Sequence, residues 1–260
     1  MSHGFFTNTI DGSRVLDNSQ PMDGLRIVPQ LVARYDLANY AYTDYPGATG
    51  AQPGYTLRIY NVDTYTPTSN RKVIRFSTLP ANGQDVWGSG VSIQFAPGSV
   101  ITHPKIYVFA LDYVTASSAQ WGFFMWHETT GALLYDSGNL HLSLNQLFNI
   151  DINTAVSGTA SVVPDSLITS AAAPLGAFPA SPAFCLPSLE MYRYRSNRVD
   201  GREEWRASPF FRVSGASLQA RMMRTEYEAN EVGTINPVSI ASTARGTDLP
   251  VLCIDTANYD

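Results

Sequence analysis

The chain has 260 residues, of which 44 % are hydrophobic and 15 % charged, and its formal net charge is −5. This length and apolar content exclude a disordered chain and suit one large or two modest domains. The negative charge, without any run of Lys and Arg, argues against nucleic-acid binding, and no apolar run is long enough to span a membrane. We expect no secretory signal in residues 1–20, and we expect Cys185 and Cys253 to be reduced core residues of a chain made in a cytoplasm.

Aromatic residues are abundant, with 14 Tyr and 12 Phe, whereas the charged share lies well below the typical value of about 25 %. Such a composition gives a weakly solvated surface that suits protein neighbours. An aromatic-rich β core under an ordinary neutral surface explains the same numbers. Composition alone leaves both interpretations open.

Residues 3–20, HGFFTNTIDGSRVLDNSQ, predict a β-hairpin with a tight turn at Asp11 and Gly12. Short runs rich in β-branched and aromatic residues follow at 25–28, 55–60, 73–76, 91–95 and 105–111, each bounded by Pro, Gly or Asn. This pattern is typical of an all-β sandwich or barrel. In 105–111 both faces of the predicted strand are apolar, so a third layer or another subunit should cover it.

Residues 121–139, WGFFMWHETTGALLYDSGN, predict a second hairpin of the same kind, with Gly131 at positive φ. Each hairpin continues into an alternating segment, which makes two three-strand meanders. We expect an antiparallel β-sandwich domain over 1–150, built from these duplicated hairpin and meander units. The Asp that ends each hairpin is expected to cap a turn. The matching positions are Gly4, Phe5, Phe6, Gly12 and Asp17 with Gly122, Phe123, Phe124, Gly131 and Asp136.

Residues 151–183 are rich in Ala, Ser, Thr and Pro and predict an extended connector that cannot pack by itself. We expect a neighbouring subunit to hold it, with the chain's own domain as the alternative. A C-terminal, mainly β region follows over 184–260; within it, 217–232 fits either helix or strand, with strand slightly favoured. The interface candidates are Leu167, Ile168, Leu175 and Phe178 of the connector, with Phe124 and Trp126 of the second hairpin.

Catalytic, cofactor and metal sites are not indicated by any motif. The four His lack metal-ligand spacing, and Glu203 and Glu204 are adjacent, so they would point to opposite faces of a strand. No phosphate-binding loop or nucleophile elbow occurs. The Tyr-rich region 35–65 suits a sugar-binding surface, but Tyr is equally common in strands and at protein interfaces.

The two hairpins resemble a pattern found in small tail proteins of tailed bacteriophages and prophages. These proteins open with Met-x-x-Gly and an aromatic-rich strand, and later repeat a Gly turn that ends in Asp-Ser. The resemblance covers about 40 residues; Trp121 stands where Tyr is usual, and 150–230 has no counterpart. The matching positions are Gly4, Phe5, Gly12 and Asp17, then Trp121, Gly122, Phe123, Gly131, Asp136 and Ser137, and the ending at 252–255.

The resemblance implies a structural virion component of the tail tip or baseplate without catalytic activity. Its partners would be other tail-tip, baseplate or fibre proteins and further copies around the tail axis, and it would require no cofactor. A receptor- or carbohydrate-binding β module that contacts a host-surface glycan is the alternative, and a hydrolase with a dispersed site is a third reading.

Overall fold

The architecture comes from a computed structural model. Within the described residues the chain forms strands β1 to β19 and two short 3₁₀ helices, η2 (Leu37–Asn39) and η5 (Thr256–Asn258). The structure describes residues 6–8, 14–17, 29–47, 49–63, 73–80, 85–110, 116–118, 121–126, 131, 133–151, 170–174, 179–186, 192–198, 201–215, 217–230, 239–242 and 248–260.

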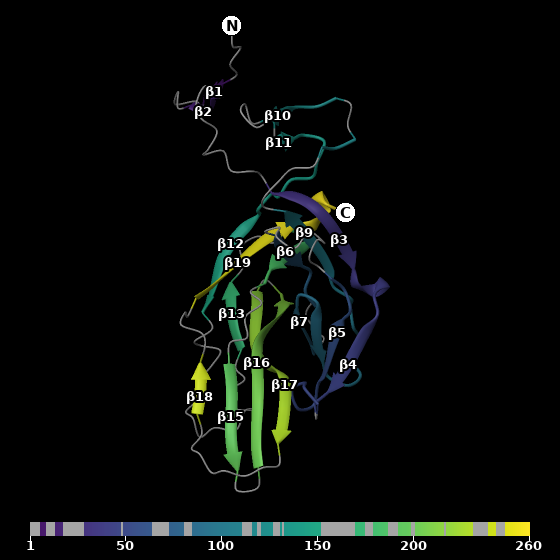
Figure 1. Ribbon diagram of the computed structural model, residues 1–260, viewed down its shortest axis with the longest axis vertical. Coiled ribbons are helices and arrows are strands. Elements are labelled where there is room, and N and C mark those ends of the chain that lie inside the picture. The colour runs from purple at the N-terminus through teal and green to yellow at the C-terminus, as the bar shows by residue number, and fades with distance from the viewer. Residues whose placement is uncertain are drawn as a thin grey trace.

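Two large antiparallel sheets form the body of the molecule (Figure 1). The first has six strands in the order β12–β19–β14–β6–β9–β3. The second has nine strands; seven follow the order β13–β17–β16–β7–β8–β5–β4, while β15 pairs with β16 and β18 pairs with β15. The six-stranded sheet contains β3 (Gln30–Asp36), β6 (Val73–Ser77), β9 (Lys105–Ala110), β12 (Gln146–Asp151), β14 (Pro182–Cys185) and β19 (Asp248–Asp255). The nine-stranded sheet contains β4 (Tyr42–Pro46), β5 (Thr56–Tyr60), β7 (Val86–Ser89), β8 (Ser92–Phe95), β13 (Ser170–Pro174), β15 (Tyr192–Arg198), β16 (Gly201–Ser214), β17 (Ser217–Asn230) and β18 (Ser239–Ser242).

Buried apolar side chains join the facing sides of the two sheets. The predicted all-β antiparallel sandwich is therefore confirmed, and 217–232 is a strand over its described part. One core cluster contains Ile150, Phe184, Val251 and Cys253 from the first sheet and Phe211, Leu218, Ala220 and Met222 from the second. Another contains Ile106 and Val108 from the first sheet, Tyr60 and Ile93 from the second, and Leu37 of η2.

Strand β9 is covered on both faces, as its sequence predicts. Its inward residues Ile106 and Val108 lie in the core between the sheets. Its outward residues Tyr107 and Phe109 pack with Phe76 and the C-terminal Tyr259 in a separate buried cluster. The cover is therefore a third layer supplied by this chain, with the C-terminal turn η5 as part of it.

The strand order of the two sheets is repeated in the two halves of the chain. In the first half, β6, β9 and β3 run from the middle of one sheet to its edge. In the other sheet, β7, β8 and β5 run outward from the middle, and β4 lies beyond them at the edge. In the second half, β14, β19 and β12, with β16, β17 and β13, take the corresponding places in the same chain order. Only β4, β15 and β18 lack a counterpart among the described sandwich strands.

A short sequence repeat supports this correspondence. SGVSIQ at 89–94 forms the β7–β8 turn, and SGASLQ at 214–219 forms the β16–β17 turn. Gly90 and Gly215 have φ of 59° and 58°, which suits hairpin turns with Gly at the first central position. Ile93 and Leu218, at matching positions, are both fully buried. The internal duplication predicted for the hairpins thus extends through the sandwich.

The two halves meet where each strand pairs with its own counterpart. In the first sheet β6 pairs with β14 through Ser77 and Phe184, and in the second β7 pairs with β16 through Gly88 and Phe211. We call these two antiparallel junctions the seam. When an approximate two-fold axis relates two equivalent halves, a strand beside the axis pairs with its own counterpart in the other half. The same pairing occurs between the subunits of a symmetric dimer.

The predicted division of the chain differs from this arrangement. Both sheets combine strands from 1–150 with strands from 184–260, so residues 1–150 do not build the sandwich alone. Part of the predicted connector 151–183 is strand, because β13 pairs with β17 and β14 begins at Pro182. Backbone hydrogen bonds of antiparallel pairing form without regard to side-chain size, so an Ala-rich segment can be a strand. Residues 152–169 and 175–178, which include Leu167, Ile168, Leu175 and Phe178, lie outside the described residues.

The hairpins also differ from their predicted place. β1 (Phe6–Asn8) pairs only with β2 (Arg14–Asp17), and β10 (Phe124–Trp126) only with β11 (Leu133–Asp136), so each forms a separate two-stranded sheet. Both lie beyond the same end of the sandwich in Figure 1. They are not sandwich sheets, because the two large sheets are completed by strands from the two halves of the chain.

Tyr259 should be a major source of stability for the third layer. Its ring packs against Phe109 with a centroid separation of 5.2 Å, its hydroxyl donates to the carbonyl of His141 (3.1 Å), and the amide of Ser143 donates to that hydroxyl (2.7 Å). Replacing Tyr259 by Ala should lower the free energy of unfolding by roughly 3–5 kcal/mol. Tyr259→Phe should cost about 1–2 kcal/mol, because only the hydrogen bonds are lost.

Urea unfolding followed by circular dichroism measures both changes. Tyr45→Ala, at an exposed position on β4, is the matched control and should change stability by no more than about 0.5 kcal/mol. Equal effects of Tyr259→Ala and Tyr45→Ala would contradict a structural role for the C-terminal layer.

Candidate functional site

The two hairpins share one pairing register, including an irregularity at the same step. In the first, Phe6 lies opposite Asp17 and Asn8 opposite Arg14, with a shift in register between Thr7 and Asn8. In the second, Phe124 lies opposite Asp136 and Trp126 opposite Leu133, with a shift between Met125 and Trp126. The alignment derived from sequence therefore holds for Phe6 with Phe124 and for Asp17 with Asp136. Gly4, Phe5 and Gly12 lie outside the described residues.

Asp136 ends the second hairpin as a buried cap. Its carboxylate accepts hydrogen bonds from the amides of Ser117 (2.7 Å) and Gly138 (2.8 Å). Burial alone would raise the pKa of Asp136, but these two hydrogen bonds, with the nearby His141, outweigh it and lower that pKa. The expected turn cap is confirmed, and the amide bonds favour the ionised carboxylate.

The structure explains why glycine is needed at two positions of the motif. A Cβ on Gly122 would lie 2.7 Å from Oγ of Ser137, so only glycine leaves room for that hydroxyl. The hydroxyl of Ser137 accepts a hydrogen bond from the amide of Phe123 (2.8 Å). Gly131 has φ of 65°, the positive value predicted for the turn. Gly122, Asp136 and Ser137 therefore fix the base of the hairpin, where its two strands begin and end, and Gly131 lies in the turn at the other end.

Large apolar side chains remain exposed on and just after this hairpin. Trp121 is 90 % exposed and Trp126 is 55 % exposed. A two-stranded hairpin alone is marginal in water, and large exposed apolar side chains on and after it are available for contact with other proteins. We call this set the aromatic end; its members are Trp121, Phe123, Trp126, Leu140, Leu144 and Leu147.

The sequence-based interface candidates are only partly described. Phe124 is half-buried and Trp126 exposed, and their rings stack with centroids 5.5 Å apart and planes 26° apart. The four candidates of the connector lie outside the described residues. Trp121, Phe123, Leu140, Leu144 and Leu147 were missed as interface candidates. Trp121 stands at the start of the motif, and Leu140 and Leu144 belong to the alternating segment 140–144.

The Tyr-rich region divides into buried and exposed members. Tyr60 is buried, and its hydroxyl lies 2.7 Å from Nδ1 of His103. Tyr42 and Tyr45 of β4 are 48 % and 39 % exposed. The guanidinium of Arg58 lies 3.6 Å from the ring centroid of Tyr42 and forms a two-point ion pair with Asp44, with both contacts at 2.7 Å. These residues give β4 an exposed aromatic surface beside a charged pair.

Among the residues that the structure describes, no group of three or more His, Cys, Asp and Glu could hold a metal ion. In the same part of the chain, no helix has both the length and the apolar character needed to cross a bilayer. Both cysteines are free thiols, and burial, with a smaller effect of Asp255, raises the pKa of Cys253 to about 11. A thiol with that pKa is almost entirely protonated at neutral pH and is a poor nucleophile.

Comparison of the chain with protein-family models, with curated proteins and with solved structures gave no match.

Gly122→Ala should destabilise the second hairpin, because the new methyl group would collide with the Ser137 hydroxyl. Overpacking of this kind costs roughly 1–3 kcal/mol. Hydrogen exchange of the 123–126 and 133–136 amides should accelerate, while that of β9 stays unchanged. Adding Ser137→Ala should recover part of the loss; no recovery would show that the collision is not the cause.

The second hairpin should lose stability in acid. Because the folded-state pKa of Asp136 lies below its ordinary value of 3.8, its contribution is complete above that value and is lost as the pH falls through the folded-state pKa. Fluorescence of the hairpin tryptophans, followed from pH 6 downward, measures the transition. Asp136→Asn should weaken the hairpin at neutral pH and shift the acid transition; an identical acid profile in this variant would contradict the assignment.

Proposed function

We propose that the chain is a non-enzymatic structural component of a phage tail tip or baseplate that contributes to tail-tip assembly and host attachment. The observation that carries the proposal is the duplicated hairpin. In its second copy, Gly122, Asp136 and Ser137, which match the pattern of small tail proteins, fix the base of the hairpin, while Trp121 and Trp126 remain exposed. A motif whose residues shape a surface suits an assembly protein better than an enzyme.

In this role the aromatic end docks on another protein of the tail tip, baseplate or fibre. Exposed Trp side chains are well suited to this, because Trp contributes more than most residues to binding energy at protein interfaces. The chain would be made in the bacterial cytoplasm and incorporated into the virion, with several copies around the tail axis.

A receptor- or carbohydrate-binding module is the second candidate, and the surface of β4 favours it. Tyr42 and Tyr45 offer exposed aromatic rings, and the Arg58–Asp44 pair supplies charged hydrogen-bonding groups beside them. This function would use a different face of the molecule from the aromatic end. The same protein could carry both.

Immunogold electron microscopy of purified particles tests the tail proposal directly. Particles induced from the strain that encodes the gene should carry label at one end of the tail. A double variant, Trp121→Ala with Trp126→Ala, should fold normally but incorporate at least tenfold less protein into particles, since interface Trp residues often cost more than 1 kcal/mol when truncated. Val100→Ala, at a position 69 % exposed on the sandwich, is the matched control.

Label absent from all particles, or normal incorporation of the double variant, would contradict the proposal. A glycan array probed with the wild-type protein and with Tyr42→Ala tests the alternative. Binding that Tyr42→Ala abolishes, in a protein missing from particles, would favour the carbohydrate module.

A further inference from the structure

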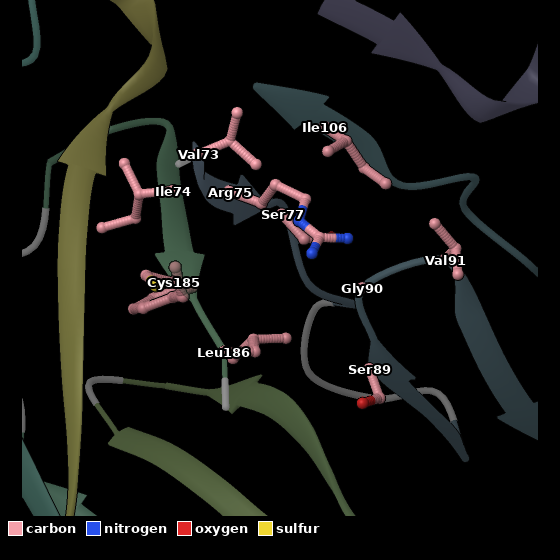
Figure 2. A pocket seen from close by; sticks show the side chains of 11 residues that line it. Val73, Ile74, Arg75, Ser77, Ser89, Gly90, Val91, Ile106, Cys185 and Leu186 are labelled. Carbon is pink, nitrogen blue, oxygen red and sulfur yellow. The ribbon is translucent and has the colours of Figure 1, made fainter. Parts of the chain in front are cut away.

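We infer that a hollow beside the seam binds a small ligand that combines an apolar body with a carboxylate. The hollow encloses about 270 Å³ and is bounded by β6, the β7–β8 turn, β9 and the end of β14 (Figure 2). This inference goes beyond the proposed function and does not depend on it. It rests on a comparison between the two halves of the chain.

The hollow lies at a position where the two halves of the chain carry side chains of very different size. Ser77 of β6 pairs with Ile106 of β9, and in the other half Phe184 of β14 pairs with Cys253 of β19, so Ser77 and Phe184 hold equivalent places. Phe184 is completely buried and fills the core between the sheets in its own half. In the first half the short side chain of Ser77 leaves that space unfilled, and Ser77 lines the hollow.

Apolar side chains form most of the wall. Val73, Val91 and Ile106 belong to the core cluster of the first half, and Leu186 packs against the cluster of the second. The volume lies just below the range of about 300–1,000 Å³ that is usual for ligand pockets. The site therefore suits a body no larger than a single ring or a short aliphatic chain.

Arg75 supplies the polar contact. Residues 73, 75 and 77 lie on one face of β6, because side chains alternate along a strand, and Val73 on this face packs in the core between the sheets. Figure 2 shows the guanidinium of Arg75 projecting into the hollow between β6 and the β7–β8 turn. A guanidinium has five donors in a planar fork, which matches a carboxylate in two-point contact.

A free small acid and the C-terminal residue of another chain both present this chemistry. Benzoate, its neutral analogue benzamide and the cation benzylamine are matched probes of the first source. The tripeptide Gly-Gly-Phe and its C-terminal amide are matched probes of the second. Binding to the full-length protein is measured by titration calorimetry and by shifts in backbone amide resonances.

Benzoate should bind about tenfold more tightly than benzamide, because the charge-assisted contact is lost in the amide, and benzylamine should bind most weakly. The amide resonances of Val91 and Ile106 should move. If the tripeptide binds more tightly than benzoate, the site recognises a chain terminus; if it binds more weakly, the site recognises a free acid.

Two variants separate the parts of the site. Arg75→Met should reduce benzoate affinity about tenfold and leave benzamide affinity unchanged. Ser77→Phe, which copies the second half, should fill the hollow and abolish binding of both. Thr43→Phe, on exposed β4, is the control that adds the same side chain elsewhere and should bind as the wild type does.

The wild-type titration is decisive even if Ser77→Phe fails to fold. Absence of saturable benzoate binding at millimolar concentrations, equal affinity for benzoate and benzamide, or binding without movement of the Val91 and Ile106 resonances would each overturn the inference.

Discussion

The architecture depends on the antiparallel pairing of each half of the chain with its counterpart at the seam. Ser77 opposite Phe184 and Gly88 opposite Phe211 join two small sandwiches into sheets of six and nine strands. Each half alone would end in an unpaired inner strand, β6 and β7 in one half and β14 and β16 in the other. Unpaired strand edges invite association with other chains, and the seam removes four of them within one molecule.

Several features follow from this pairing. Equivalent halves related by an approximate two-fold axis bring equivalent segments together near that axis. Beside the hairpins, the amide of Leu31 donates to the carbonyl of Leu140, and the amide of Leu142 donates to the carbonyl of Pro29, each at 2.8 Å. The segments that follow the two hairpins thus meet each other, which explains why both hairpins leave the sandwich at one end. The same correspondence identifies Ser77 as the place where one half lacks a core side chain that the other half has.

Local patterns in the sequence were enough to predict much of this structure. The two apolar faces of 105–111 correctly indicated a covered strand, and the matching positions of Phe6 with Phe124 and of Asp17 with Asp136 correctly aligned the two hairpins. Strand 170–174 could not be predicted from composition, since a run of Ala residues carries no strand pattern and the strand is defined by its pairing with β17, about 45 residues later in the chain. The pairing of β6 with β14 could not be predicted either, because it joins residues about a hundred positions apart and no local sequence pattern encodes it.

At the candidate site, the sequence identified the closing residues but not the exposed surface. Asp136 and Gly131 follow from turn chemistry, whereas the exposure of Trp121 depends on what the rest of the chain leaves uncovered. The match between SGVSIQ and SGASLQ was visible in the sequence and would have extended the duplication beyond the hairpins. The proposed tail function therefore rests on a motif present twice in a chain in which six strands of each half of the sandwich are also present twice.

Nuclear Overhauser contacts across the seam test the central claim, that two equivalent halves are joined strand to counterpart strand, most directly. In the full-length protein, with amide and α-proton resonances assigned, the account predicts cross-strand backbone contacts between Ser77 and Phe184 and between Gly88 and Phe211. Contacts between β6 and β9, such as Phe76 with Tyr107, serve as the internal reference. Reference contacts present while both seam contacts are absent, or β6 and β7 found paired with other strands, would contradict the account.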